Sequence, residues 1–231
     1  MTIKNAIFLD FDGVLSNSVK EAYLLSRYAF KNIDVYCDIE KELYQKFIDN
    51  RYVVQNSWQY YYLIKYCYEN NNSLLNSLKQ NEITDKFNEK FLSKRKELMR
   101  DDLVFWNSLD EKTNFLEKIE DVIKMENVFI LSTKNKEAIA LKFDFWNIEY
   151  NLSNIIGKSE ILNYSKGDFI EEFLQEKNIN NAILIDDIEE NITSCNDKKN
   201  ISAYLTLWGY GKSSLKSYKE EEIEKIIREK I

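Results

Sequence analysis

The chain has 231 residues, of which 44% are hydrophobic, so it can form a packed core and is longer than one minimal domain. Its net charge of −7 argues against a nucleic-acid partner, because phosphate backbones recruit basic surfaces. The chain has no histidine, which excludes Ser/His/Asp catalysis and histidine-ligated zinc. Acid–base chemistry therefore depends on carboxylates, lysine or tyrosine.

The N-terminal residues lead directly into an apolar run, without the pattern of a secretory leader. No apolar run is long enough to span a membrane. We therefore expect a soluble, cytoplasmic protein with no membrane partner. The cysteines are odd in number and lack CxxC spacing, which favours reduced thiols over disulfides or a thiolate metal site: Cys37, Cys67 and Cys195.

The first predicted element is a buried strand over Ile7–Leu9, because an unbroken apolar run is typical of a central parallel strand. Asp10 and Asp12 follow at its carboxyl end, where open α/β sheets place their ligand sites. Their two-residue spacing directs both carboxylates the same way. Two carboxylates that share one space need a cation or a shared proton, and Gly13 lets the chain turn away.

The next eighty residues show helical apolar spacing and no strand-like alternation. We predict an all-helical insertion at residues 19–100, within a core domain made of residues 1–18 and 101–231. Residues 103–125 are predicted to continue as a helix that returns the chain to the core.

The remaining core is predicted to alternate strands and helices. A second apolar run, 127–131, ends in the hydroxyls of Ser132 and Thr133, and by itself this segment also fits a strand followed by an ordinary helix cap. A third run, 181–185, ends in Asp186 and Asp187, a pair of hard oxygen ligands of the kind that Mg²⁺ accepts. Other expected elements are helices at 136–146, 169–176 and 219–231, a short strand near 155–156, and a last strand at 203–207.

The segment Asp10–Val14, DFDGV, resembles the first motif of the haloacid dehalogenase (HAD) superfamily. In that family the first aspartate is the nucleophile and the second is the general acid/base, which here implies these roles for Asp10 and Asp12. The resemblance implies a Rossmann-like three-layer α/β/α sandwich with an inserted helical cap of the C1 type.

Two further HAD motifs have counterparts. Ser132 stands where the family holds the transferring phosphoryl group with a hydroxyl, and Thr133 beside it is a candidate substrate contact. Lys166, at the start of a helix, stands in the place of the lysine that steadies the nucleophile. Lys158 is the alternative for that role and another candidate substrate contact.

The acidic pair resembles the fourth motif of the family in its Asp-Asp form. The alignment implies Asp187 as the metal ligand, with Asp186 as the alternative. Asn191 stands where many members have another aspartate, so one negative charge fewer is expected around the metal. The Trp208–Gly211 loop is similar to one in phosphoglycolate-phosphatase-like members, and Trp208 is a candidate substrate contact.

The resemblance implies a Mg²⁺-dependent phosphatase that hydrolyses a small phosphate monoester, such as a sugar phosphate or amino-alcohol phosphate, through an aspartyl-phosphate. Dehalogenase members lack an aspartate at the position of Asp12, so phosphoryl transfer is favoured over carbon–halogen cleavage. The alternatives are a phosphomutase and a non-catalytic phosphate-binding or regulatory protein. Candidate substrate contacts in the cap are Arg51, Trp58 and Arg95, with Arg100 a further cationic side chain there.

Overall fold

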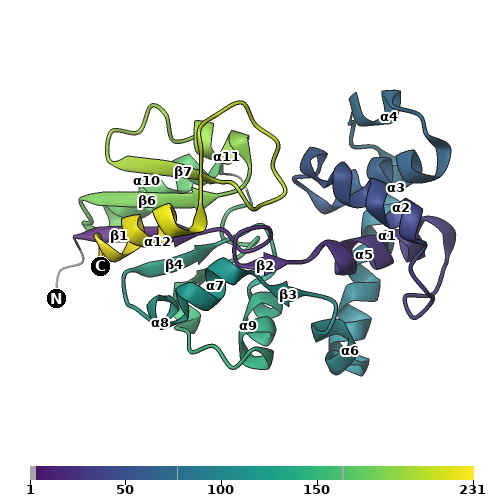
Figure 1. Ribbon diagram of the computed structural model, residues 1–231, viewed down its shortest axis with the longest axis horizontal. Coiled ribbons are helices and arrows are strands. Elements are labelled where there is room, and N and C mark those ends of the chain that lie inside the picture. The colour runs from purple at the N-terminus through teal and green to yellow at the C-terminus, as the bar shows by residue number, and fades with distance from the viewer. Residues whose placement is uncertain (1–3, 77, 163) are drawn as a thin grey trace. The chain divides into compact units, whose positions relative to one another are not determined.

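The apolar runs of the sequence form the strands of one parallel sheet. The computed structural model describes residues 4–76, 78–162 and 164–231. Within these residues the sheet has the strands β1 (Asn5–Leu9), β4 (Val128–Leu131), β5 (Ile155–Ile156), β6 (Asn181–Asp186), β7 (Ile201–Thr206) and β8 (Ser217–Tyr218). Neighbouring strands pair in parallel in the order β5-β4-β1-β6-β7-β8 (Figure 1).

Helices cover both faces of this sheet, which gives the predicted three-layer α/β/α sandwich. Ile7 and Leu9 of β1 pack into one hydrophobic cluster, whereas Ala6 and Phe8 pack into the other. This alternation is the two-residue period of a strand that is buried on both sides. The first cluster is covered by α7 (Asn114–Lys118), α8 (Glu120–Ile123), α9 (Lys136–Phe145) and α12 (Glu220–Arg228), and the second by α10 (Lys166–Lys177) with α11 (Glu189–Thr193) beside it.

The chain divides into two compact units. The core unit comprises the residues up to Asn17 together with Lys112–Ile231, and the helical unit is Ser18–Glu111. The chain passes between them through β2 (Ser16–Asn17) and β3 (Glu111–Lys112), which pair with each other. The helical unit contains α1 (Val19–Lys31), α2 (Lys41–Asp49), α3 (Tyr60–Glu69), α4 (Ser73–Asn76), α5 (Glu82–Asp101) and α6 (Leu103–Asn107), with 3-10 turns at Arg51–Val53 and Ser57–Gln59.

A chain of aromatic rings fills the centre of the helical unit. The ring of Phe47 lies 5.4 Å from that of Tyr23 and 5.7 Å from that of Tyr60, and Tyr60 in turn stacks on Phe91 at 5.5 Å. All four residues are at least nine-tenths buried. Because aromatic side chains bury large apolar areas, these contacts hold α1, α2, α3 and α5 together. Among the described residues, no helix is both long and apolar enough to cross a membrane.

Asparagine ends several helices in this glycine-poor chain. Asn32, Asn70 and Asn178 are the C-caps of α1, α3 and α10, and each has a φ between 54° and 59°. After glycine, asparagine is the residue that tolerates this left-handed conformation best. The chain can therefore terminate its helices although it has only five glycines.

Two sequence expectations about the fold are wrong. Residues 103–125 do not form one helix but α6, β3, α7 and α8, because β3 pairs with β2 and the Thr113 hydroxyl accepts a hydrogen bond from Leu116 N that starts a new helix. The strand predicted at 203–207 is not the last, since β8 pairs with β7 beyond it. A two-residue strand is too short to show any periodicity in sequence.

Candidate active site

The carboxyl ends of three adjacent strands bring the predicted site residues together. Leu9 of β1 lies opposite Ile130 of β4 and Ile185 of β6. Since the strands are parallel and in this register, the residues that follow them emerge at one edge of the sheet. Asp10, whose N–H donates to the carbonyl of Ile185 at 2.9 Å, therefore lies between Ser132 and Asp186.

Lys166 joins two of the buried carboxylates. Its Nζ lies 2.7 Å from Asp10 Oδ1 and 2.7 Å from Asp186 Oδ2. Lys166 is the first residue of α10, which begins where the Ser165 hydroxyl accepts a hydrogen bond from Asp168 N. By contrast Lys158, the alternative for this role, is half-buried and gives its backbone N–H to the carbonyl of Lys134.

Burial and charge both act on this group. The pKa of the Asp10 carboxyl is raised to about 7: burial raises it most, the Lys166 ammonium lowers it, and the carboxylates of Asp186 and Asp12 add to the rise. Burial opposes the charge on Lys166, but Asp10 and Asp186 more than offset this, so the pKa of Lys166 is raised. The site therefore favours a positive charge beside Asp10.

Asp186 and Asp187 have different surroundings although they are consecutive. The Asp186 carboxylate accepts hydrogen bonds from Lys166, from Ile188 N at 2.9 Å, and from Asn191 Nδ2 at 3.0 and 3.1 Å. The Asp187 carboxylate accepts a hydrogen bond from the backbone N–H of Tyr210 at 2.6 Å. Asn191 thus donates to Asp186, which an aspartate in its place would not do while ionised.

Two glycine-containing loops close around Asp187. Gly13 has a φ of +94°, and a Cβ on it would lie 2.4 Å from Asp187 Oδ2. A Cβ on Gly209 would lie 2.1 Å from the Asp187 Cβ. Any larger residue at either position would displace this carboxylate, so both glycines are needed for the close approach.

The three carboxylates form a set that fits a divalent cation. Oxygen atoms of Asp10, Asp186 and Asp187 all lie within 4.8 Å of one another, and all three residues are buried. The Lys166 ammonium lies against two of them, Asp10 and Asp186, and offsets part of their charge. Hard carboxylate oxygens with excess negative charge are the donor set that Mg²⁺ accepts.

Asp12 lies outside this carboxylate set and is held by a different lysine. Lys134 Nζ is 3.0 Å from Asp12 Oδ1. Lys134 was not among the predicted site residues. The sequence does contain a signal for it: Lys134 follows Ser132 by two residues, just as Asp12 follows Asp10, and in extended chain such residues point the same way.

The two hydroxyl residues after β4 differ in exposure. Ser132 is 1% exposed, and its Oγ accepts a hydrogen bond from Lys134 N at 3.2 Å. Thr133 is exposed. Ser132 is therefore part of the buried edge that holds the carboxylates, whereas Thr133 faces solvent in the core unit.

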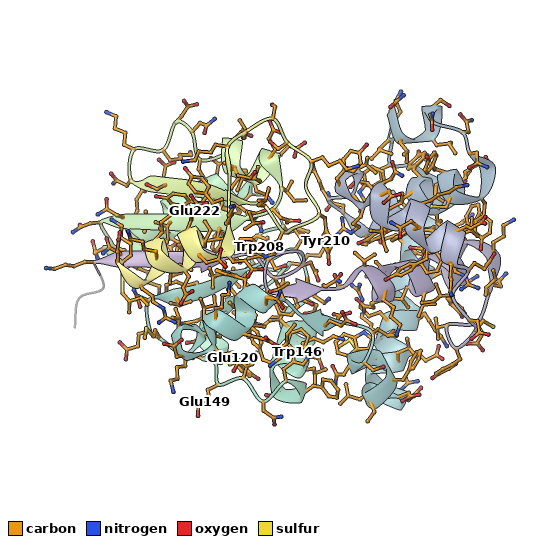
Figure 2. All side chains as sticks on the ribbon, viewed as in Figure 1. Glu120, Trp146, Glu149, Trp208, Tyr210 and Glu222 are labelled. Atoms are coloured by element: carbon orange, nitrogen blue, oxygen red, sulfur yellow. The ribbon has the colours of Figure 1, made fainter. Side chains whose placement is uncertain are left out.

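The Trp208–Gly211 loop packs against the segment that follows β1. Trp208 and Tyr210 both extend from this loop (Figure 2). The Trp208 indole donates to the carbonyl of Val14 at 3.1 Å, and its ring lies 4.7 Å from that of Phe115. Trp208, predicted as a substrate contact, thus contributes to the packing of the core unit.

The predicted contacts in the helical unit interact within that unit. The Arg51 guanidinium donates to the carbonyl of Val54 at 2.6 Å and lies over the Tyr60 ring. Arg95 donates from Nε and Nη2 to the fully buried Glu21 at 2.8 and 3.0 Å. Trp58 is half-buried, with its ring 6.4 Å from that of Tyr62, and the exposed Arg100 pairs with Asp101.

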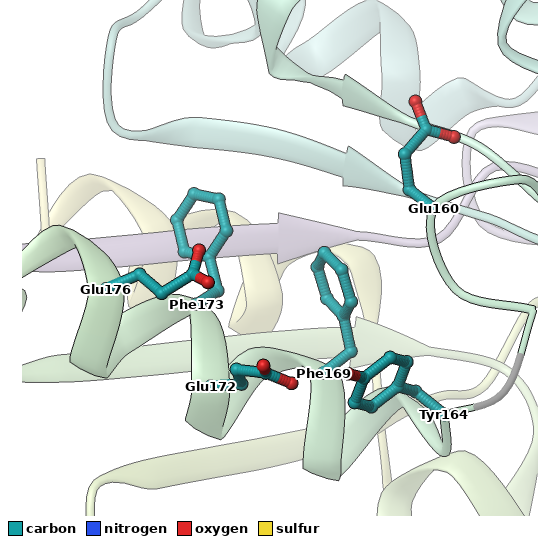
Figure 3. A pocket seen from close by; sticks show the side chains of 6 residues that line it. All are labelled: Glu160, Tyr164, Phe169, Glu172, Phe173 and Glu176. Atoms are coloured by element: carbon teal, nitrogen blue, oxygen red, sulfur yellow. The ribbon is translucent and has the colours of Figure 1, made fainter.

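A hollow of about 170 Å³ lies along α10 (Figure 3). Its lining combines three carboxylates and three aromatic rings: Glu160, Tyr164, Phe169, Glu172, Phe173 and Glu176. Phe169 and Phe173 extend toward the sheet, where they pack against its hydrophobic cluster (Figure 3). A lining with three carboxylates repels phosphate, so this hollow is not a phosphate site.

Comparison with known proteins identifies the fold. No protein-family model and no curated protein matches the chain. Among solved structures, a predicted phosphatase from Clostridium acetobutylicum is similar with a TM-score of 0.63 at 16% identity, over 98% of this chain and 99% of that one. A hydrolase of the haloacid dehalogenase-like family from Streptococcus pneumoniae gives a TM-score of 0.56 at 17% identity, over 98% and 99%.

A third similar structure is a predicted phosphoglycolate phosphatase from Haemophilus somnus, with a TM-score of 0.59 at 12% identity, over 91% of this chain and 88% of that one. Likeness over nearly the full length of each chain covers both the sheet and the helical insertion. The chain therefore has the fold of the haloacid dehalogenase superfamily, as the DFDGV motif predicts.

Proposed function

We propose that the protein is a Mg²⁺-dependent phosphatase that hydrolyses a small phosphate monoester through an aspartyl-phosphate on Asp10. The observation that carries this proposal is the meeting of Asp10, Asp187, Lys166 and Ser132 at one sheet edge, with Asp12 one residue beyond Asp10. The similar solved structures that are described as phosphatases support the same class.

The first step in this proposal forms a bond between an Asp10 carboxylate oxygen and phosphorus. The bond from phosphorus to the ester oxygen breaks, and Asp12 gives that oxygen a proton so that an alcohol leaves. In the second step Asp12 takes a proton from water as the water oxygen attacks phosphorus. The bond between phosphorus and the Asp10 oxygen breaks, so inorganic phosphate is released and the Asp10 carboxylate is restored.

Asp10, Asp187 and the backbone carbonyl of Asp12 are the groups that we propose hold Mg²⁺, whose charge would offset that of the phosphoryl oxygens. Asp187 is favoured over Asp186 because the Asp186 carboxylate already accepts hydrogen bonds from Lys166, Asn191 and a backbone N–H. Lys166 and the Ser132 hydroxyl provide further positive charge and a hydrogen-bond donor at the same edge.

We assign selection of the substrate to the helical unit, because all the residues in the chemical steps belong to the core unit. Trp58, which is half-buried, is the preferred candidate there, since Arg51 and Arg95 already interact with neighbouring groups. Thr133 and Lys158 are the candidates in the core unit. The substrate we expect is a small phosphorylated metabolite in the cytoplasm.

The mechanism is tested by comparing Asp10→Asn with Asp12→Asn on an aryl phosphate, which has a good leaving group. Asp10→Asn removes the nucleophile, so no phosphoenzyme forms. Asp12→Asn keeps the nucleophile but loses the acid and base, which typically costs ~10²–10⁴-fold in rate. Because a good leaving group needs little protonation, Asp12→Asn should accumulate phosphoenzyme, which mass spectrometry after a rapid acid quench detects and locates.

A matched control is Asp144→Asn, an acid-to-amide change at an exposed position on α9. It should retain wild-type turnover and show no accumulated phosphoenzyme. Phosphate on a residue other than Asp10, or a fully active Asp10→Asn protein, contradicts the proposal. A phosphatase releases inorganic phosphate, whereas a phosphomutase returns the phosphoryl group to the substrate, so measured phosphate release distinguishes the two.

A further inference from the structure

Lys134 is a buried cation whose charge is directed at Asp12. Its side chain is 1% exposed, whereas that of Asp12 is 24% exposed. The Lys134 Nζ lies 3.0 Å from Asp12 Oδ1 and 5.4 Å from the centre of the Phe11 ring. Burial of an ammonium is costly unless a partner compensates for lost hydration, so this placement is tied to the carboxylate and the ring.

The backbone of Lys134 is fixed on both sides. Its N–H donates to Ser132 Oγ at 3.2 Å, and its carbonyl accepts from Lys158 N at 3.1 Å. Gly157 lies so close that a Cβ there would be 3.1 Å from the Lys134 carbonyl oxygen. The ammonium therefore projects from a rigid frame, which lets it set the position of the group that it binds.

Asp12 itself lies in a tight turn. Gly13 N, next in the chain, donates to the carbonyl of Ser16 at 2.7 Å. This bond fixes the backbone of the turn but leaves the two side-chain torsions of Asp12 to be set by other contacts. A charge-assisted bond to Lys134 restricts those torsions and favours one orientation of the carboxylate.

We infer that Lys134 is a positioning residue that orients the Asp12 carboxylate for proton transfer, an inference that rests on the proposed function. Lys166 and Lys134 then have separate tasks. Lys166 binds Asp10 and Asp186, the nucleophile and its neighbour, whereas Lys134 binds the acid/base. Loss of Lys134 should therefore slow only those steps in which Asp12 transfers a proton.

The test compares Lys134→Met with the wild type on an aryl phosphate and on an alkyl phosphate, both with Mg²⁺ supplied. Misplacement of a catalytic group by about 1 Å costs on the order of 10²-fold. Formation of the phosphoenzyme from the alkyl phosphate and its hydrolysis should each slow by about that factor. Formation from the aryl phosphate should change little, so phospho-Asp10 should accumulate, as detected by mass spectrometry after an acid quench.

Lys134→Arg restores a cation and should recover part of the alkyl-phosphate rate. Lys136→Met, two residues away at the start of α9, is the matched control and should behave as the wild type. If Lys134→Met does not fold, as judged by circular dichroism, Lys134→Gln provides the same comparison with a polar side chain of similar length.

Equal slowing of aryl and alkyl phosphates without accumulated phosphoenzyme would show that Lys134 acts on the phosphoryl group instead, which overturns the inference. Unchanged kinetics in a folded Lys134→Met protein also overturns it. A wild-type protein that releases no phosphate from either ester counts against the proposed function itself, which separates the two failures.

Discussion

The core unit and the helical unit both bury charged side chains, but they balance them differently. At the sheet edge of the core unit, three carboxylates lie close together, and two of them contact the ammonium of Lys166. In the helical unit, the buried carboxylate of Glu21 accepts hydrogen bonds from Arg95 and from the indole N–H of Trp106 at 2.6 Å. A cluster of buried negative charges is unfavourable unless a bound ligand of opposite charge neutralises it. A buried ion pair with balanced charge can instead be part of the packing.

This difference indicates which unit is expected to carry out the chemistry and which uses its charges for structure. The helical unit uses its buried charges to join α1 to α5 and α6, whose contacting residues lie 74 and 85 positions further along the chain. The core unit concentrates several acids where parallel strands end, and the pKa of Asp10 is raised there. Changes in the two units should therefore separate into effects on activity and effects on stability.

The largest effect is expected from removing the proposed Mg²⁺ with a chelator, because all the residues proposed to hold it belong to the core unit. In excess chelator the protein should lose phosphatase activity, and Mg²⁺ should restore it, as followed by phosphate release from an aryl phosphate. Ca²⁺ should substitute poorly, because its looser coordination disturbs the positions of the reacting groups. Full activity in chelator would contradict the assignment of the carboxylate set as a metal site.

The next largest effect is expected in the helical unit, from Arg95→Ala. This change leaves the Glu21 carboxylate buried without its guanidinium partner, and breaking a buried pair in this way costs about 3–5 kcal/mol. The free energy of unfolding measured in urea should fall accordingly. The control is Arg100→Ala, whose pair with Asp101 is exposed and should leave the unfolding midpoint unchanged. A fall no larger than that of the control would show that the Glu21 network is not structural.

The pH dependence of the free energy of unfolding should reveal the raised pKa of Asp10 in the core unit. The pKa of Asp10 is raised from 3.8 to about 7, chiefly by burial, so between these values the folded protein holds a proton that the unfolded chain releases. In chelator this group makes the free energy of unfolding fall as pH rises from about 4 to 7. Asp10→Asn should remove that contribution, as urea unfolding at several pH values would detect.

Mg²⁺ provides the complementary measurement, because it binds the ionised carboxylates. Its stabilising effect on the wild type should grow over the same pH interval and be smaller in Asp10→Asn. The same pH slope in the wild type and in Asp10→Asn would contradict the raised pKa.

The smallest effect is expected from Trp58→Ala in the helical unit. If this unit selects the substrate, the change should alter the ratio of kcat/KM between two phosphorylated metabolites by ~10-fold. Turnover of an aryl phosphate should change less, because the chemical groups of the core unit are untouched. An unaltered preference over a panel of such substrates would indicate that the residues that select the substrate lie in the core unit, with the Trp208 loop the first candidate.

The sequence by itself determined the strands of the core and the residues at their ends. Long apolar runs that stop at acids or hydroxyls are local signals, because a parallel strand is buried on both faces and its carboxyl end faces the ligand site. Asp10, Ser132 and Asp186 follow such runs, and helical periodicity was enough to indicate an insertion of helices after the first strand.

Only the tertiary structure decided which charges meet, because a lysine carries no local sign of its partner. Lys134 and Asp12 are 122 residues apart, and Arg95 and Glu21 are 74 apart. The same holds for β8, whose two residues form a strand only because β7 lies beside them. These features depend on burial and long-range pairing, which no pattern of neighbouring residues encodes.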